Sequence, residues 1–220
     1  TYFSEGKGMV LKSQLSSMEW EDLTHFEGNA NAFRLLTHQF RGRRKGGFVM
    51  TYSTLASIVK YPFPSILAGK KLKFGFFTTE EDSYLKIAKE LGIKRLSADN
   101  EPPKYARHPL VFLVEAADDI CYQMMDIEDA HKLKLLTTEE AKNLYMGFFD
   151  DYKRKRADEI CHIVTDTNEQ IAYFRASVIG ILVSECTRVF IENEEKILNG
   201  EFEGALIKHI APHLKDAYNH

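Results

Sequence analysis

The segment 110–131 carries the residues best suited to chemistry, because it combines many carboxylates with a helical pattern. When successive residues are placed about 100° apart, five carboxylates and one tyrosine fall within an arc of about 100°. These residues are Glu115, Asp118, Asp119, Tyr122, Asp126 and Asp129. The opposite side is apolar apart from Glu128, and it holds Leu113, Ala116, Ala117, Ile120, Cys121, Met124 and Ile127. The spacing therefore predicts an amphipathic helix with one strongly acidic face.

An acidic helix face is most often a surface in contact with water, but two features of this one argue for another role. Like charges three and four residues apart repel each other, and no lysine or arginine is interleaved with them. The first half of the segment, 111–117, is nearly apolar all round, which predicts burial. A carboxylate removed from water must be paired, protonated or bound to a cation, and hard divalent cations prefer carboxylate oxygens. The pattern leaves two interpretations open: a solvated face, and a metal site or polar ligand cleft.

The elements that must position this face are predicted to be helices almost throughout. Apolar residues at three- and four-residue spacing predict helices over 30–40, 51–61, 80–92, 110–136, 137–162, 167–198 and 202–218. Thr137 and Glu140 have the spacing of a capping box that opens one of them. Residues 69–79 alternate enough for a short β-ribbon or an ordered loop, and residues 1–17 are expected to be a loop or a frayed terminus. We therefore expect an all-α fold that forms one helical region over residues 1–220, with no linker that divides it.

The composition excludes several classes of protein. The chain has 220 residues, of which 44% are hydrophobic and 28% charged, and this balance is that of an ordinary globular protein. The net charge of −3 provides no general attraction for nucleic acid or anionic membranes. Three cysteines without a C-x-x-C pair favour a reduced, cytoplasmic compartment. No apolar stretch approaches the roughly 20 residues that a membrane span needs, and no signal peptide opens the chain.

Three blocks of sequence resemble the bacterial dGTPase-like deoxynucleoside triphosphate (dNTP) triphosphohydrolases of the HD-domain superfamily. The first block is EAADDICY followed by DIEDA, in residues 115–122 and 126–130. The second is FEGNANAFR in residues 26–34, and the third combines Leu55 with the KYP of residues 60–62. The blocks occur in the order and at the spacing typical of that family. The resemblance implies an HD-domain-like helical bundle.

The resemblance also implies roles for three residues of the acidic face. Asp118 matches the last aspartate of the superfamily metal site, which binds a divalent cation such as Mg²⁺ or Mn²⁺. Tyr122 matches the aromatic residue that packs on the deoxyribose and disfavours a 2′-hydroxyl group, and Asp126 matches an acidic position near the sugar. Residues spaced by four lie on one face of a helix, which is consistent with a row that contacts metal and sugar in turn.

The second and third blocks imply further substrate contacts. Asn29 and Arg34 are expected to line the same pocket, and Lys60 is expected to bind the triphosphate. Asn31 stands where the family usually has glutamine, so any contact made by that side chain is shortened by one methylene. The basic segment 41–45 could be a solvated loop, a substrate contact, or a contact to nucleic acid or to an allosteric nucleotide.

The chain departs from the family pattern in one important respect. None of its eight histidines is followed by aspartate, and the family's catalytic histidine and glutamate have no counterpart here. We therefore expect the C-terminal portion of a longer enzyme that has no catalytic residues of its own, is inactive alone, and holds metal weakly or not at all. The reaction that the resemblance implies is hydrolysis of a dNTP to a deoxynucleoside and inorganic triphosphate.

Two alternatives remain open at this point. The first is a non-catalytic helical module that binds nucleotides or nucleic acid, and the second is an HD-type hydrolase of phosphomonoesters or cyclic nucleotides. The family resemblance also implies a homo-oligomer. Outside the blocks, we expect Arg175 to form an ion pair between helices and Cys121 to be a small core residue.

Overall fold

The computed structural model describes residues 2–3, 5–42 and 47–219, and within them it is helical, with no β-strand. Its internal contacts divide the chain into two compact units. Unit 1 comprises residues 1–111 and 195–202, and unit 2 comprises residues 112–194 and 203–220. The predicted all-α fold is confirmed.

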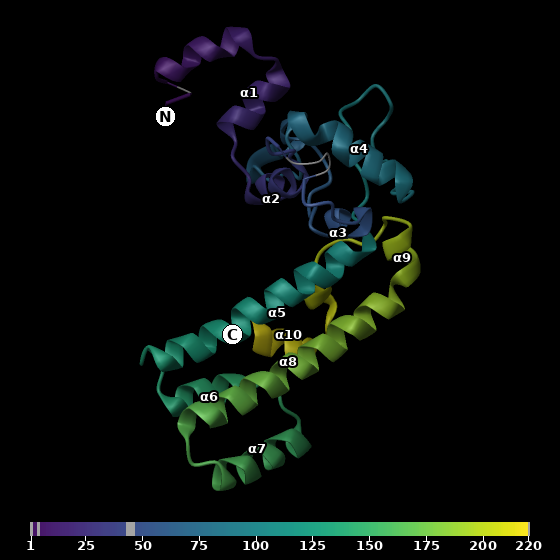
Figure 1. Cartoon of the computed structure of the whole chain (residues 1–220). Coiled ribbons are helices and arrows are strands. Elements are labelled where there is room, and N and C mark those ends of the chain that lie inside the picture. The colour runs from purple at the N-terminus through teal and green to yellow at the C-terminus, as the bar shows by residue number, and fades with distance from the viewer. Residues whose placement is uncertain (1, 4, 43–46, 220) are drawn as a thin grey trace. The chain divides into compact units, whose positions relative to one another are not determined.

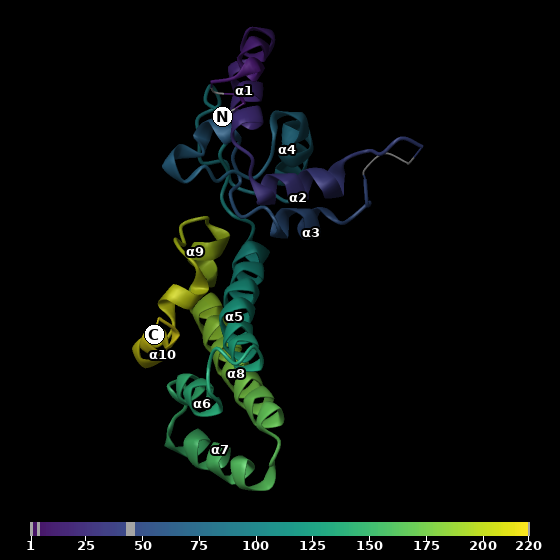
Figure 2. The same ribbon diagram turned by 90° about the vertical axis from the view of Figure 1, so that its left-hand side faces the viewer.

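Unit 1 is built from short helices, which Figures 1 and 2 show in purple to blue. They are η1 (Lys7–Gln14), α1 (Ser17–Thr24), α2 (Gly28–Thr37), α3 (Tyr52–Ser57), η2 (Ser65–Leu67), η3 (Gly69–Lys71), η4 (Thr78–Glu80) and α4 (Glu81–Glu90). The last residues of α9 (Glu194–Leu198) also belong to this unit. Phe33, Val59, Phe76, Tyr84 and Ile87 form its main core. The ring of Phe76 stacks on that of Tyr84, with centroids 4.7 Å apart, so that α2, α3 and α4 share one aromatic centre.

Two local expectations for unit 1 can be compared with this structure. Residues 7–14, expected to be part of a loop or frayed terminus, form the 3-10 helix η1. Residues 69–79 contain η3 and η4, and the backbone of Phe76 makes only an isolated bridge to Pro64. That segment is therefore the ordered loop of the two alternatives, not a ribbon.

Unit 2 contains the long helices of the chain. They are α5 (Pro109–Lys132), which enters the unit at residue 112, α6 (Thr138–Met146), α7 (Asp151–Ile163), α8 (Thr167–Glu192), η5 (Leu206–His209) and α10 (Pro212–Tyr218). Figures 1 and 2 both show α5 and α8 side by side. The core contains Ile120, Met124, Tyr145, Phe174 and Leu182. The hydroxyl group of Tyr145 donates a hydrogen bond to the carbonyl of Met124, which joins α6 to α5.

Three predicted helices of unit 2 are divided in the structure. The capping box of Thr137 and Glu140 is confirmed, but the helix it opens ends at Met146, and a new one begins after Asp150. Phe148 and Phe149 lie between them and are buried, so the chain turns there to place both rings in the core. The segment 167–198 divides into α8 and α9, and 202–218 into η5 and α10, which Pro212 opens. Among the described residues, no helix has the length and apolar composition that crossing a lipid bilayer requires.

Candidate functional site

The predicted row of Asp118, Tyr122 and Asp126 lies on α5 and faces solvent. All three side chains are exposed, and that of Tyr122 is 67% exposed. None of the three forms a hydrogen bond or ion pair with another residue in the part of the chain that the structure describes. Because they are spaced by four residues, they present two carboxylates and one aromatic ring on the same side of the helix. The row is therefore available to a ligand or to another polypeptide.

The predicted burial of the other residues of α5 is confirmed only in part. Ala116, Ile120 and Met124 are buried as expected, but Leu113 is 40% exposed and Val114 is 47% exposed, in a segment predicted to be buried. The prediction that Cys121 is a core residue is wrong, since its side chain is exposed. The covered side of α5 is the ridge of Phe112, Ala116, Ile120, Met124 and Glu128 with Val111 and Glu115 next to it, and the exposed apolar side chains lie outside this strip.

A buried ion pair holds α5 to α8. Glu128, only 6% exposed, accepts a hydrogen bond from the guanidinium group of Arg175 on α8 and forms a second ion pair with Lys132, 3.0 Å away. The interhelical pair predicted for Arg175 is thus confirmed. It also explains why an acidic residue occupies the apolar side of α5, since a buried carboxylate needs such a partner.

In unit 1, the second sequence block forms the start of α2. Glu27 is 3% exposed, and its carboxylate accepts hydrogen bonds from the backbone nitrogens of Asn29 and Ala30, from the Asn29 side chain at 3.0 Å and from Lys73 at 2.9 Å. Burial favours the neutral acid, but the hydrogen bonds from Lys73, Ala30 and Asn29 outweigh it and hold the pKa of Glu27 below its usual value. The side chain of Asn29 is therefore fixed by Glu27 at the first turn of α2.

The third block brings a second lysine to this place. The ammonium group of Lys60 lies 5.9 Å from the ring centre of Tyr61. The hydrogen bond and charge of Glu27 raise the pKa of Lys73, and the charge of Lys60 is near enough to oppose that rise. Gly75 permits the arrangement, because a Cβ atom there would collide with the carbonyl oxygen of Tyr61. Glu27 thus holds Asn29 and Lys73 together, and Lys60 lies within electrostatic range of Lys73. The sequence pattern identified Lys60 but not Lys73, since Lys73 lies in a loop without periodicity.

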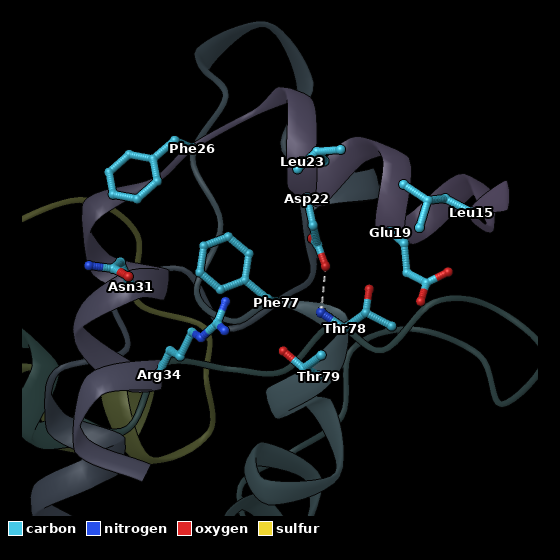
Figure 3. Close-up of a pocket in the computed structure, with 10 residues that line it drawn as sticks. All are labelled: Leu15, Glu19, Asp22, Leu23, Phe26, Asn31, Arg34, Phe77, Thr78 and Thr79. Carbon is cyan, nitrogen blue, oxygen red and sulfur yellow. Dashed lines mark hydrogen bonds between the residues drawn. The ribbon is translucent and has the colours of Figure 1, made fainter. Parts of the chain in front are cut away.

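Arg34 lies elsewhere on α2 and lines a cavity of about 370 Å³ (Figure 3). Asn29 and Arg34 are five positions apart, which places them about 140° apart around a helix. The structure puts Asn31, not Asn29, beside Arg34 in the cavity wall. The guanidinium group of Arg34 is 3.9 Å from the carboxylate of Glu80, a distance that leaves it available for other contacts.

The remaining walls of this cavity come from α1 and from the segment that leads into η4. Phe26 and Phe77 provide aromatic surface, and Asp22 and Thr78 provide polar groups. One oxygen of Asp22 accepts a hydrogen bond from the backbone nitrogen of Thr78 at 2.6 Å, the dashed line in Figure 3. Motif reasoning did not connect these residues because they come from separate elements; Phe26 belongs to the second block, and no sequence signal pointed to Asp22, Phe77 or Thr78.

The predicted site residues therefore fall into three groups. Asn29 is held with Lys73 by Glu27 in unit 1, where Lys60 is within electrostatic range of Lys73; Arg34 lines the cavity of Figure 3, and the row of α5 lies in unit 2. Among the described residues, no group of three histidine, cysteine, aspartate or glutamate side chains could hold a metal ion. Asp118 thus does not form a metal site with the other described residues. The basic segment 41–45 lies partly outside the described residues.

Several known proteins are similar to this chain in sequence. No protein family model matches the chain. It is 35% identical, over 95% of its length, to a deoxyguanosinetriphosphate triphosphohydrolase-like protein of Pseudomonas aeruginosa, and 32% identical over 92% to one of Synechocystis sp.. It is 28% identical over 94% to a deoxyguanosinetriphosphate triphosphohydrolase of Yersinia enterocolitica.

The resemblance carried by the three sequence blocks is thus confirmed: the chain is a homologue of proteins named dGTP triphosphohydrolase-like. The chain spans less than half the length of these relatives, namely 47%, 46% and 41%.

Proposed function

We propose that this chain is part of an enzyme that hydrolyses a dNTP, such as dGTP, to a deoxynucleoside and inorganic triphosphate. The observation that carries the proposal is the exposed row on α5, which has the residue types and spacing of the family motif and no partner among the described residues. The names of the relatives support it. A cytoplasmic location and a homo-oligomeric assembly belong to the same proposal.

The row on α5 would contact the sugar end of the substrate. The ring of Tyr122 offers a flat apolar surface on which deoxyribose can pack, and a 2′-hydroxyl group would be disfavoured against it. The carboxylate of Asp126, one turn further along, can accept a hydrogen bond from a sugar hydroxyl. Asp118 is proposed as one ligand of a divalent cation, Mg²⁺ or Mn²⁺, whose other ligands lie beyond the described residues.

The two lysines of unit 1 would bind the triphosphate. Its negative charge requires cations; Lys73 is held by Glu27, and Lys60 lies within electrostatic range of Lys73. Arg34 is proposed as a further substrate contact. In the reaction, a water oxygen bonds to the α-phosphorus while the bond to O5′ breaks, and the deoxynucleoside leaves with a proton on O5′.

The proposal is tested by product analysis on the natural polypeptide that contains this chain, with dGTP and either Mg²⁺ or Mn²⁺. We expect equimolar deoxyguanosine and inorganic triphosphate. Asp118→Asn should reduce turnover by at least about 100-fold, as expected when a metal ligand or its support is lost. The variant should melt at the wild-type temperature, because the side chain is exposed. Glu139→Gln, an exposed carboxylate of α6, serves as the matched control and should retain full turnover.

Two outcomes contradict the proposal. Release of orthophosphate or of a monophosphate would indicate a different hydrolase, and full turnover by the Asp118→Asn variant would remove this residue from the site. Binding of dGTP without any hydrolysis by the natural polypeptide would instead indicate a nucleotide-binding module.

A further inference from the structure

The cavity of Figure 3 lies wholly within unit 1 and has a mixed lining. Its volume of about 370 Å³ is within the range of small-molecule sites in proteins. Phe26 is 74% exposed although a large aromatic ring gains free energy from burial, and Phe77, 8% exposed, also lines the cavity. The two rings provide apolar surface for a flat ligand that enters between them.

Polar groups with unused hydrogen-bonding capacity converge on the same space. The second carboxylate oxygen of Asp22 and the hydroxyl oxygen of Thr78 are buried and have no hydrogen-bond partner among the described residues. Among the described residues, the side-chain amide of Asn31 forms no hydrogen bond, and the guanidinium group of Arg34 has only its contact of 3.9 Å with Glu80. A buried polar group without a partner costs free energy, so a ligand that satisfies these groups would be favoured.

The charge around the cavity selects against an anion. Asp22 and Glu19 both line it, and Arg34 is the cation of its wall. Nearby, partial burial and the negative charges of Asp82 and Asp22 raise the pKa of Glu81, which indicates a local excess of negative charge. A phosphorylated ligand would place more negative charge in this region. A neutral ligand with N–H groups for the carboxylate and acceptors for the guanidinium group fits the lining better.

We propose that this cavity binds a neutral nucleobase-containing molecule, a nucleoside rather than a nucleotide. The flat ring lies between Phe26 and Phe77, and its edge donates to Asp22 and accepts from Asn31 and Arg34. The buried hydroxyl group of Thr78 can both donate and accept. The inference rests on the proposed function only through Arg34, which we assign both to the dNTP site and to this cavity. The test variants therefore leave Arg34 unchanged.

The test measures binding of deoxyguanosine, deoxyadenosine, thymidine and deoxycytidine to the 220-residue chain by equilibrium dialysis and saturation-transfer NMR. We expect saturable binding of at least one nucleoside, weaker binding of its triphosphate at this site, and no binding of free deoxyribose. Asn31→Ala and Phe26→Ala should each weaken nucleoside binding about tenfold, the effect of losing roughly one hydrogen bond or one stacking contact. Leu35→Ala and Phe48→Ala, exposed residues that do not line the cavity, are the matched controls.

Several results would overturn the proposal. They are the absence of saturable binding by all four nucleosides, equal losses in the control variants, and full binding by both test variants. Selective binding of Nα-acetylarginine amide instead would show a site for a basic side chain. Circular dichroism verifies folding, and Asn31→Ala keeps the test valid if Phe26→Ala does not fold. Asp118→Asn should retain nucleoside binding, so failure of this proposal and failure of the proposed hydrolysis are distinguishable.

Discussion

At the scale of single residues, Glu27 has a structural role within the second sequence block. Its carboxylate closes the first turn of α2, fixes the Asn29 side chain and holds Lys73 in place. Asn29 and Lys73 are thus positioned by one buried acid, and the proposed triphosphate contacts depend on it. Through Glu27, the motif holds both the start of α2 and the loop that carries Lys73.

Glu27→Gln should lower the free energy of unfolding by about 1–2 kcal/mol at neutral pH, because a charged acceptor of several hydrogen bonds becomes neutral. Since the folded-state pKa of Glu27 is below its ordinary value of about 4.3, its stabilising contribution is complete above that pH. The contribution is lost as the pH falls through the folded-state pKa. Urea unfolding from pH 7 down to pH 3 checks this.

The difference in stability between wild type and Glu27→Gln should shrink as the pH falls. The exposed Glu90 at the end of α4 provides the control, and Glu90→Gln should leave the stability nearly unchanged. A difference that stays constant down to pH 3 would contradict the assigned role of the ionised carboxylate.

At the scale of elements, α5 has a buried side that packs in the core and an exposed side that carries the proposed sugar and metal contacts. Its buried ridge packs in the core of unit 2 and is held to α8 through Glu128 and Arg175. Its exposed side carries Asp118, Tyr122 and Asp126. The ion pair fixes the rotation of α5 about its own axis, and so decides which carboxylates face outward.

Arg175→Met should destabilise unit 2 by about 1–3 kcal/mol, because it leaves the buried Glu128 with Lys132 alone. Thermal unfolding followed by circular dichroism measures the loss. A double change of Glu128→Leu with Arg175→Met should recover part of it, since no buried charge then remains. The control is Arg188→Met on the same helix, where the ion pairs are exposed. Equal effects of both single changes would contradict this account.

A second feature at the scale of elements is the start of α7, which a helix cap fixes. The Asp150 side chain accepts a hydrogen bond from the backbone nitrogen of Lys153 at 2.7 Å and so opens α7. Asp150→Ala should cost about 1 kcal/mol, the usual value of such a cap, and should speed amide exchange in the first turn of α7. Hydrogen exchange followed by NMR measures this, with the neighbouring Asp151→Ala as control. Unchanged exchange at residues 152–154 would show that the cap does not matter.

At the scale of the whole molecule, the chain contains parts of a proposed site without a metal centre formed among its described residues. We expect that Mn²⁺ does not bind tightly to the 220-residue chain through Asp118, because one exposed carboxylate is a weak ligand by itself. Electron paramagnetic resonance titration of Mn²⁺ measures this with wild type and Asp118→Asn. Tight binding that the substitution abolishes would contradict the expectation.

The sequence by itself determined the helical class, the acidic row of α5, the capping box at Thr137 and the family resemblance. These features depend on local spacing, and the three- and four-residue period of a helix is readable in the chain. The sequence also indicated the pairing of Arg175, because a lone charge among apolar residues needs a partner.

Only the tertiary structure decided which side of α5 is covered, that Cys121 is exposed, and that Arg34 and Asn29 face different surroundings. It also brought Lys73 to Glu27 and assembled the cavity from Asp22, Phe26 and Thr78. The physical reason is that burial depends on which neighbours a residue meets, and those neighbours come from distant parts of the chain. Local periodicity carries no information about such contacts.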